Sequence, residues 1–118
     1  MMNNLVLSSQ EQQERLQHRL GVSLDKITEL CRSYSIQRLA VFGSILTDNF
    51  KPSSDVDFLV SVLPDLRLTL NYHQSLEESL EQIINRKVDL IFLRNLERSE
   101  NWIKKKSIIN GAQVIYES

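Results

Sequence analysis

The sequence predicts an α+β domain built on a small mixed β-sheet flanked by helices. Two observations support this class: short apolar runs with strand character alternate with longer segments whose apolar residues recur at helical spacing. The chain has 118 residues, a length that suits one domain with one core. We expect an N-terminal tail and peripheral helix over residues 1–22 and the main body of this single domain over residues 23–118.

The expected elements follow from periodicity, caps and breakers. Helices are predicted over residues 9–20, 24–34, 69–85 and 96–110. Strands are predicted over residues 36–42, 55–62 and 87–93, and residues 113–116 form a short edge strand or an extended tail. Residues 43–54 turn back between the first two strands, with a short helical turn after Ser44.

Particular residues set the bounds of the first two helices. Ser9 and Gln12 fit a capping box, and Gly21 ends the first helix, whose apolar stripe is thin. Ser23 caps the second helix, which has a full apolar face. Cys31 lies on that face, so we interpret it as a core residue rather than a reactive thiol.

The chemistry is concentrated where the first strand ends and the second begins. Gly43-Ser44 follows one apolar run, and Asp55 and Asp57 open the next after a ten-residue spacer. Residues two apart on a strand share a face, so the two carboxylates need a positive partner, and Mg²⁺ prefers such oxygen ligands. Glycine permits close approach of a phosphate, and Ser44 can donate to it. A metal with a phosphate indicates phosphoryl or nucleotidyl transfer.

A third carboxylate, Asp89, lies inside the apolar run of residues 87–93. In a core strand an unpaired charge is costly, and a metal shared with Asp55 and Asp57 would remove the cost. The alternative is a carboxylate on the solvated face of an edge strand.

Together these residues resemble the DNA polymerase beta-like nucleotidyltransferase superfamily, and in particular its minimal members. The resemblance rests on Gly43-Ser44, the spacer, Asp55, Asp57 and Asp89, and it runs from about residue 24 to residue 116. One departure is Thr47, which stands where relatives often carry a basic residue, although Lys51 lies nearby.

The resemblance implies a fold, a reaction and a partner. It implies the α/β-type nucleotidyltransferase fold, with Asp55, Asp57 and Asp89 as catalytic, metal-binding residues for one or two Mg²⁺ ions. Gly43 and Ser44 would bind the phosphates of ATP, and AMP would be transferred with release of pyrophosphate. Minimal members are commonly antitoxins that adenylylate a tyrosine of a HEPN-domain RNase toxin, which is the partner we expect.

Two other functions stay open. One is nucleotidyl transfer to a small-molecule hydroxyl, as in aminoglycoside nucleotidyltransferases. The other is a non-catalytic antitoxin that acts by binding alone.

Composition excludes several classes. The net charge of −1 does not favour direct nucleic-acid binding, and one cysteine permits no internal disulfide. No apolar run reaches the length of a membrane span and no signal peptide is evident, so we expect a cytoplasmic protein without a membrane partner.

Several residues have competing interpretations. His18 and His73 are expected on the surface, and Lys104-Lys105-Lys106 on a solvated helix face. Tyr72 is expected in the core. Trp102 fits either the core or a partner-facing surface.

Overall fold

The computed structural model describes residues 10–118, and the predicted capping residue Ser9 lies outside them. A four-stranded sheet has the order β3-β2-β1-β4. Its strands are β1 (Ile36–Phe42), β2 (Val56–Val62), β3 (Val88–Phe92) and β4 (Gln113–Glu117). The neighbours β1/β2 and β1/β4 are antiparallel, and β2/β3 is parallel, so the sheet is mixed, as predicted.

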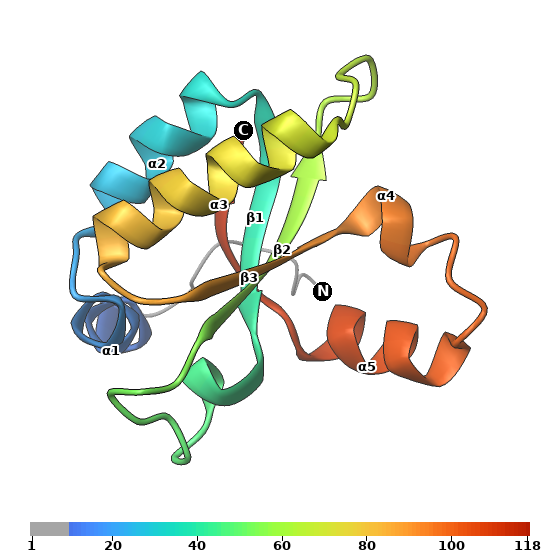
Figure 1. Cartoon of the computed structure of the whole chain (residues 1–118). Coiled ribbons are helices and arrows are strands. Elements are labelled where there is room, and N and C mark those ends of the chain that lie inside the picture. Colours follow the sequence, from blue (N-terminus) through green and yellow to red (C-terminus); the bar gives the residue numbers. More distant parts are fainter. Residues whose placement is uncertain (1–9) are drawn as a thin grey trace.

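Helices cover both faces of this sheet (Figure 1). They are α1 (Gln10–Leu20), α2 (Leu24–Ser33), α3 (Leu70–Ile84), α4 (Leu93–Leu96) and α5 (Trp102–Gly111), with a 3-10 turn η1 (Gly43–Leu46). In Figure 1, α2 and α3 lie together on one side of the strands, and α4 and α5 lie on the other. The fold class predicted from the sequence is confirmed.

The larger core fills the face under α2 and α3. Residues at even positions of β2 and β3, such as Phe58 and Leu90, are buried there together with Ile27 and Leu76. Leu16 and Leu20 of α1 belong to the same core, each at most 2% exposed. The thin apolar stripe of α1 is therefore enough to dock this helix against the rest of the domain.

A second, smaller core lies on the opposite face. Its buried residues are Ala40, Leu59, Leu96, Ile108 and Val114, from the sheet, α4 and α5. Odd positions of β2 and β3 point to this side, because side chains alternate along a strand. Asp57 and Asp89 occupy odd positions, so the proposed site faces the less covered side of the sheet.

The helix predicted over residues 96–110 is wrong at its start. The chain turns into the short α4 directly after β3, breaks, and begins α5 only at Trp102. The reason is local hydrogen bonding: the Asn101 side chain accepts from the Lys104 N–H, and the Ser99 hydroxyl accepts from the Asn101 N–H. These polar side chains take backbone donors that a continuous helix would use.

The other predicted elements are found within a few residues of their expected bounds, and residues 113–117 form a true edge strand. Ser23 occupies the N-cap of α2 but makes no side-chain capping bond. Gly21 ends α1 with a φ of 76°. Within residues 10–118, no helix is long and apolar enough to cross a membrane.

Most single-residue interpretations are also decided. Cys31 is buried, and burial raises the pKa of its thiol to about 12, which leaves it unreactive. Tyr72 packs against the main core and its hydroxyl donates to the carbonyl of Tyr34. His73, which was predicted to lie on the surface, is only half-exposed, because its ring packs edge-on against Phe92. His18 is exposed, and Trp102 is 65% exposed.

Candidate active site

Strand pairing brings Asp57 and Asp89 side by side. β2 and β3 run parallel, and their register pairs Asp57 with Asp89. Residues paired in this way present their side chains to the same face of the sheet, where neighbouring strands lie about 4.8 Å apart. Asp55 precedes β2 by one residue and is exposed, as is Asp89, whereas Asp57 is half-buried. Asp89 thus lies on an edge strand and faces solvent. The cost of burying its charge, which was assumed from the sequence, does not arise.

Gly43 touches this carboxylate group from the neighbouring strand. β1 pairs Phe42 with Asp57, and Gly43 follows with a φ of 82°, in the left-handed region. A Cβ at this position would stand 2.3 Å from Oδ2 of Asp57. The absence of a side chain at Gly43 therefore makes room for the Asp57 carboxylate. No pattern in the sequence indicated this contact; only the register of β1 and β2 reveals it.

The electrostatics centre on Asp57. Burial raises the pKa of the Asp57 carboxyl, and the negative charges of Asp89 and Asp55 raise it further. Burial is the larger of these causes, and repulsion by the neighbouring carboxylates is the smaller. A cation placed among these carboxylates would favour the charged form of all three.

Among residues 10–118, no three His, Cys, Asp or Glu side chains are already arranged as a set of metal ligands. The donor chemistry nevertheless fits a hard divalent cation, since all three groups offer carboxylate oxygens. Asp55 and Asp89 are exposed, so their side chains have space to turn toward Asp57. Convergence of the three carboxylates stays a prediction for the metal-bound protein.

Ser44 lies in the turn η1, directly after Gly43. Its backbone carbonyl accepts from both the N–H and the hydroxyl of Thr47, at 2.9 and 2.8 Å. Its own hydroxyl makes no hydrogen bond within the described part of the chain. Thr47, the residue that departs from the family pattern, thus stabilises η1 through its hydroxyl. The predicted helical turn is present, but it begins at Gly43 and spans only four residues.

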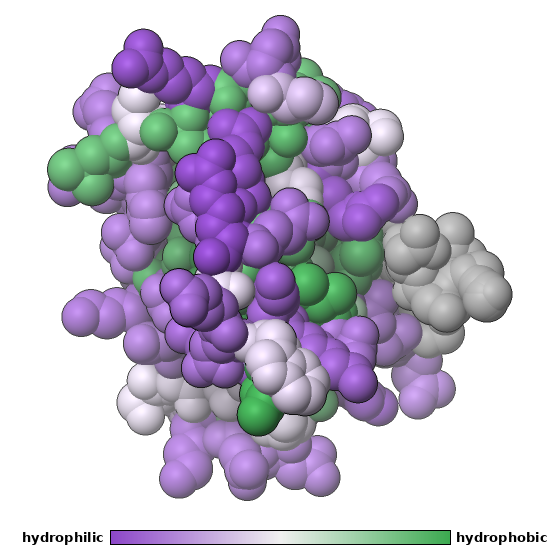
Figure 2. Space-filling model, turned by 90° about the vertical axis from the view of Figure 1, so that its right-hand side faces the viewer, coloured by the Kyte–Doolittle hydropathy of each residue, from purple (hydrophilic) through white to green (hydrophobic). Residues whose placement is uncertain are grey.

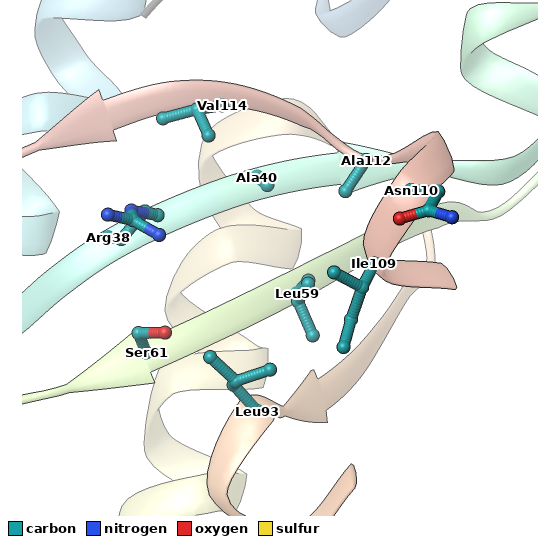
Figure 3. Close-up of a pocket in the computed structure, with 9 residues that line it drawn as sticks. All are labelled: Arg38, Ala40, Leu59, Ser61, Leu93, Ile109, Asn110, Ala112 and Val114. Atoms are coloured by element: carbon teal, nitrogen blue, oxygen red, sulfur yellow. The ribbon is translucent and has the colours of Figure 1, made fainter. Parts of the chain in front are cut away.

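A cavity of about 410 Å³ lies on the same face of the sheet (Figure 3). Its floor includes Ala40 and Leu59, and Leu59 stands two residues after Asp57. Leu93 and Ile109 reach into the cavity from α4 and α5. Arg38 and Ser61 lie at one end. Two residues along a strand correspond to about 6–7 Å, so the cavity starts close to the carboxylates.

This mixed sheet, with acidic residues beside a Gly-Ser turn, defines a nucleotidyltransferase. The model of the polymerase beta nucleotidyltransferase family matches residues 25–118. The Methanocaldococcus jannaschii protein MJ1215, named as a candidate protein adenylyltransferase, is 40% identical over 65 residues, 53% of this chain and 71% of that protein. The chain therefore belongs to the polymerase beta nucleotidyltransferase family.

Solved structures share the fold. A candidate minimal nucleotidyltransferase has a TM-score of 0.62 at 25% identity, covering 84% of this chain and 91% of its own. A toxin–antitoxin structure with AMP-PNP has a TM-score of 0.64 at 21% identity, covering 82% and 75%. A tri-AMPylated Shewanella oneidensis HEPN toxin in complex with an MNT antitoxin has a TM-score of 0.58 at 21% identity, covering 87% and 73%.

The raised pKa of Asp57 leads to a testable pH dependence. A carboxyl whose pKa is higher in the folded state binds its proton more tightly there, so the ionised form opposes folding. The stabilisation of the folded state by this tighter proton binding is complete at pH values below the unfolded pKa near 3.8. It is lost as the pH rises through the folded pKa. In chelator at neutral pH, Asp57→Asn should therefore melt a few degrees above wild type. The difference should shrink as the pH falls through the folded pKa toward 3.8 and should change no further below that value. Equal melting temperatures at neutral pH would contradict the assignment.

Proposed function

We propose that the chain is a Mg²⁺-dependent adenylyltransferase that transfers AMP from ATP to a tyrosine of a HEPN-domain toxin, and so acts as an antitoxin. The observation that carries this proposal is the pairing of Asp57 with Asp89 beside Gly43, on the open face of the sheet. Membership of the nucleotidyltransferase family and a relative named for protein adenylylation support it.

Each site residue has a defined task in this proposal. The exposed backbone N–H at Gly43 and the hydroxyl of Ser44 donate to the β- and γ-phosphate oxygens. Asp55, Asp57 and Asp89 would hold one or two Mg²⁺ ions, which would supply charge stabilisation to the triphosphate. The exposed Asp89 also accepts the proton of the attacking hydroxyl, which requires hydrogen-bond reach.

The acceptor must come from the side of the sheet that α2 and α3 leave free. That side carries α4 and α5, the cavity beside Leu59, and the exposed residues Trp102 and Ile103. Figure 2 shows it as separate hydrophobic patches among hydrophilic side chains. Lys104 and Lys106 are exposed there, whereas Lys105 donates to the Glu97 carbonyl. A protein partner suits this mixture better than a small molecule, because broad interfaces combine apolar and charged contacts.

The partner in the solved relatives supports a HEPN toxin as acceptor. The Shewanella oneidensis complex contains a tri-AMPylated HEPN toxin bound to its antitoxin. The net charge of −1 gives no general attraction for nucleic acid, so we do not propose direct RNA or DNA binding.

The proposal is tested by incubating the protein with ATP, Mg²⁺ and a HEPN-domain protein from the same organism, followed by intact mass measurement. We expect the partner to gain one or more AMP groups, on a tyrosine located by fragmentation. The reaction should stop in chelator. A partner that binds tightly and stays unmodified under these conditions would favour the binding-only antitoxin.

A further inference from the structure

Two arginines hold the spacer that connects the two halves of the site. Arg19, in the last turn of α1, directs one guanidinium nitrogen, Nη1, to two backbone carbonyls. The distances from Nη1 are 2.6 Å to the carbonyl oxygen of Ile45 and 2.7 Å to that of Thr47. Both carbonyls belong to the turn that follows Gly43-Ser44. The phosphate-binding end of the spacer is therefore attached to α1.

Arg86 makes the corresponding contacts at the other end. It lies between α3 and β3, and its Nη1 donates to the carbonyls of Lys51, Pro52 and Ser54 at 2.8, 3.1 and 2.7 Å. Ser54 directly precedes Asp55, so these bonds fix the backbone that delivers the first carboxylate.

Phe50 joins the two arginines in the middle of the spacer. The guanidinium carbon of Arg86 lies 4.4 Å from the centre of the Phe50 ring, and that of Arg19 lies 5.7 Å from it. Both distances are within the range of cation–π attraction. In Figure 1 the spacer, with η1, projects at the lower end of the sheet, on the side where α1 lies.

The spacer needs such support because it has little structure of its own. Beyond η1 it contains no helix or strand, and most of its residues are exposed. Ordering a free loop costs conformational entropy, and charge-assisted hydrogen bonds to its carbonyls offset that cost. The two arginines supply five such bonds, distributed over both ends of the loop.

We propose that Arg19 and Arg86 are positioning residues for nucleotidyl transfer: they hold residues 45–54 so that Gly43-Ser44 and Asp55-Asp57 keep one fixed arrangement toward the triphosphate. Helix α1 lies ahead of the family match, which begins at residue 25, yet Arg19 makes α1 part of the catalytic unit. This inference rests on the assignment of Gly43, Ser44, Asp55 and Asp57 made under the proposed function.

The chain contains a matched control for these variants. Arg94 binds backbone carbonyls in the same way, donating to those of Leu66, Leu63 and Pro64 at 2.8, 3.2 and 3.4 Å. These carbonyls lie just beyond the far end of β2, away from Asp55. Arg94→Ala therefore removes a comparable structural contact without touching the spacer.

The experiment measures the ATP affinity of each folded variant by calorimetry, next to its melting temperature. Arg19→Ala and Arg86→Ala should lose on the order of tenfold in ATP affinity, and up to about a hundredfold in kcat/KM, because a small displacement of reacting groups is costly. Arg94→Ala should have a lower melting temperature than wild type but the same ATP affinity. Arg86→Lys should recover part of the loss, since lysine retains the charge but not the planar stacking on Phe50.

Amide hydrogen exchange separates the two ways in which the inference can fail. Exchange of residues 44–54 should be faster in Arg19→Ala and Arg86→Ala and unchanged in Arg94→Ala. If wild type binds ATP and the two variants bind it equally well, the positioning role is overturned, whatever happens to their melting temperatures. If wild type itself binds no ATP, the nucleotide site has been assigned wrongly, and the role of the arginines falls with it.

Discussion

Replacing Asp55 and Asp57 together with Asn is expected to abolish AMP transfer and to leave most of the partner affinity intact. The two carboxylates would hold the metal that stabilises charge during transfer, a contribution of several kcal/mol. Each 1.36 kcal/mol is a factor of ten in rate, so a loss of at least about a thousandfold is expected. Partner affinity should change little, because a specific complex buries on the order of 1,600 Å² and two side chains are a small part of it.

The measurement pairs intact mass of the partner with its affinity for each variant. Asp65→Asn is the matched control, since Asp65 is an exposed carboxylate beyond the opposite end of β2. This control should modify the partner at the wild-type rate. In cells, Asp55→Asn/Asp57→Asn should fail to neutralise a co-expressed toxin at normal expression levels. If it neutralises the toxin without any mass shift, neutralisation occurs by binding alone and the catalytic proposal is wrong.

The sequence is informative about the site because the chemistry lies in short, spaced motifs. Gly43-Ser44, the ten-residue spacer and the Asp55/Asp57 pair are together enough to indicate the nucleotidyltransferase class. Asp89 is indicated by its place as a charge inside an apolar run, and the parallel pairing of β2 with β3 explains its position beside Asp57. That pairing follows from the crossover helix α3, since parallel neighbours need a long connection.

What the sequence could not show are contacts between residues far apart in the chain. Arg19 and Ile45 are 26 positions apart, and Arg86 and Ser54 are 32 apart. Arg19 stands in no motif. Arg86 begins the run Arg86-Lys87-Val88-Asp89-Leu90, which resembles the family, but nothing in the sequence indicates its contacts with the spacer. The break between α4 and α5 was missed for a different reason: helical spacing persists across residues 97–101, while side-chain hydrogen bonds of Ser99 and Asn101 interrupt the helix.

Gly43→Ala is expected to impair both folding and catalysis, through two separable effects. The φ of 82° is unfavourable for alanine, by about 1–2 kcal/mol. In addition, the new Cβ would stand 2.3 Å from Oδ2 of Asp57, so the carboxylate must move. Because this carboxylate would hold the metal under the proposed function, its displacement is expected to lower kcat/KM about a hundredfold. Gly21→Ala isolates the first effect, because Gly21 has a φ of 76° and nothing lies within 4 Å of its added Cβ.

The contact between Gly43 and Asp57 can be measured directly in a double-mutant cycle. In the Asp57→Ala background the carboxylate that the new Cβ meets is absent, and only the backbone strain should remain. The loss in free energy of unfolding caused by Gly43→Ala should then fall to the value found for Gly21→Ala in wild type. If the loss is the same with and without the Asp57 carboxylate, Gly43 does not make room for Asp57. Its importance would then lie only in the approach of the phosphate, which ATP affinity of Gly43→Ala in the same background would reveal.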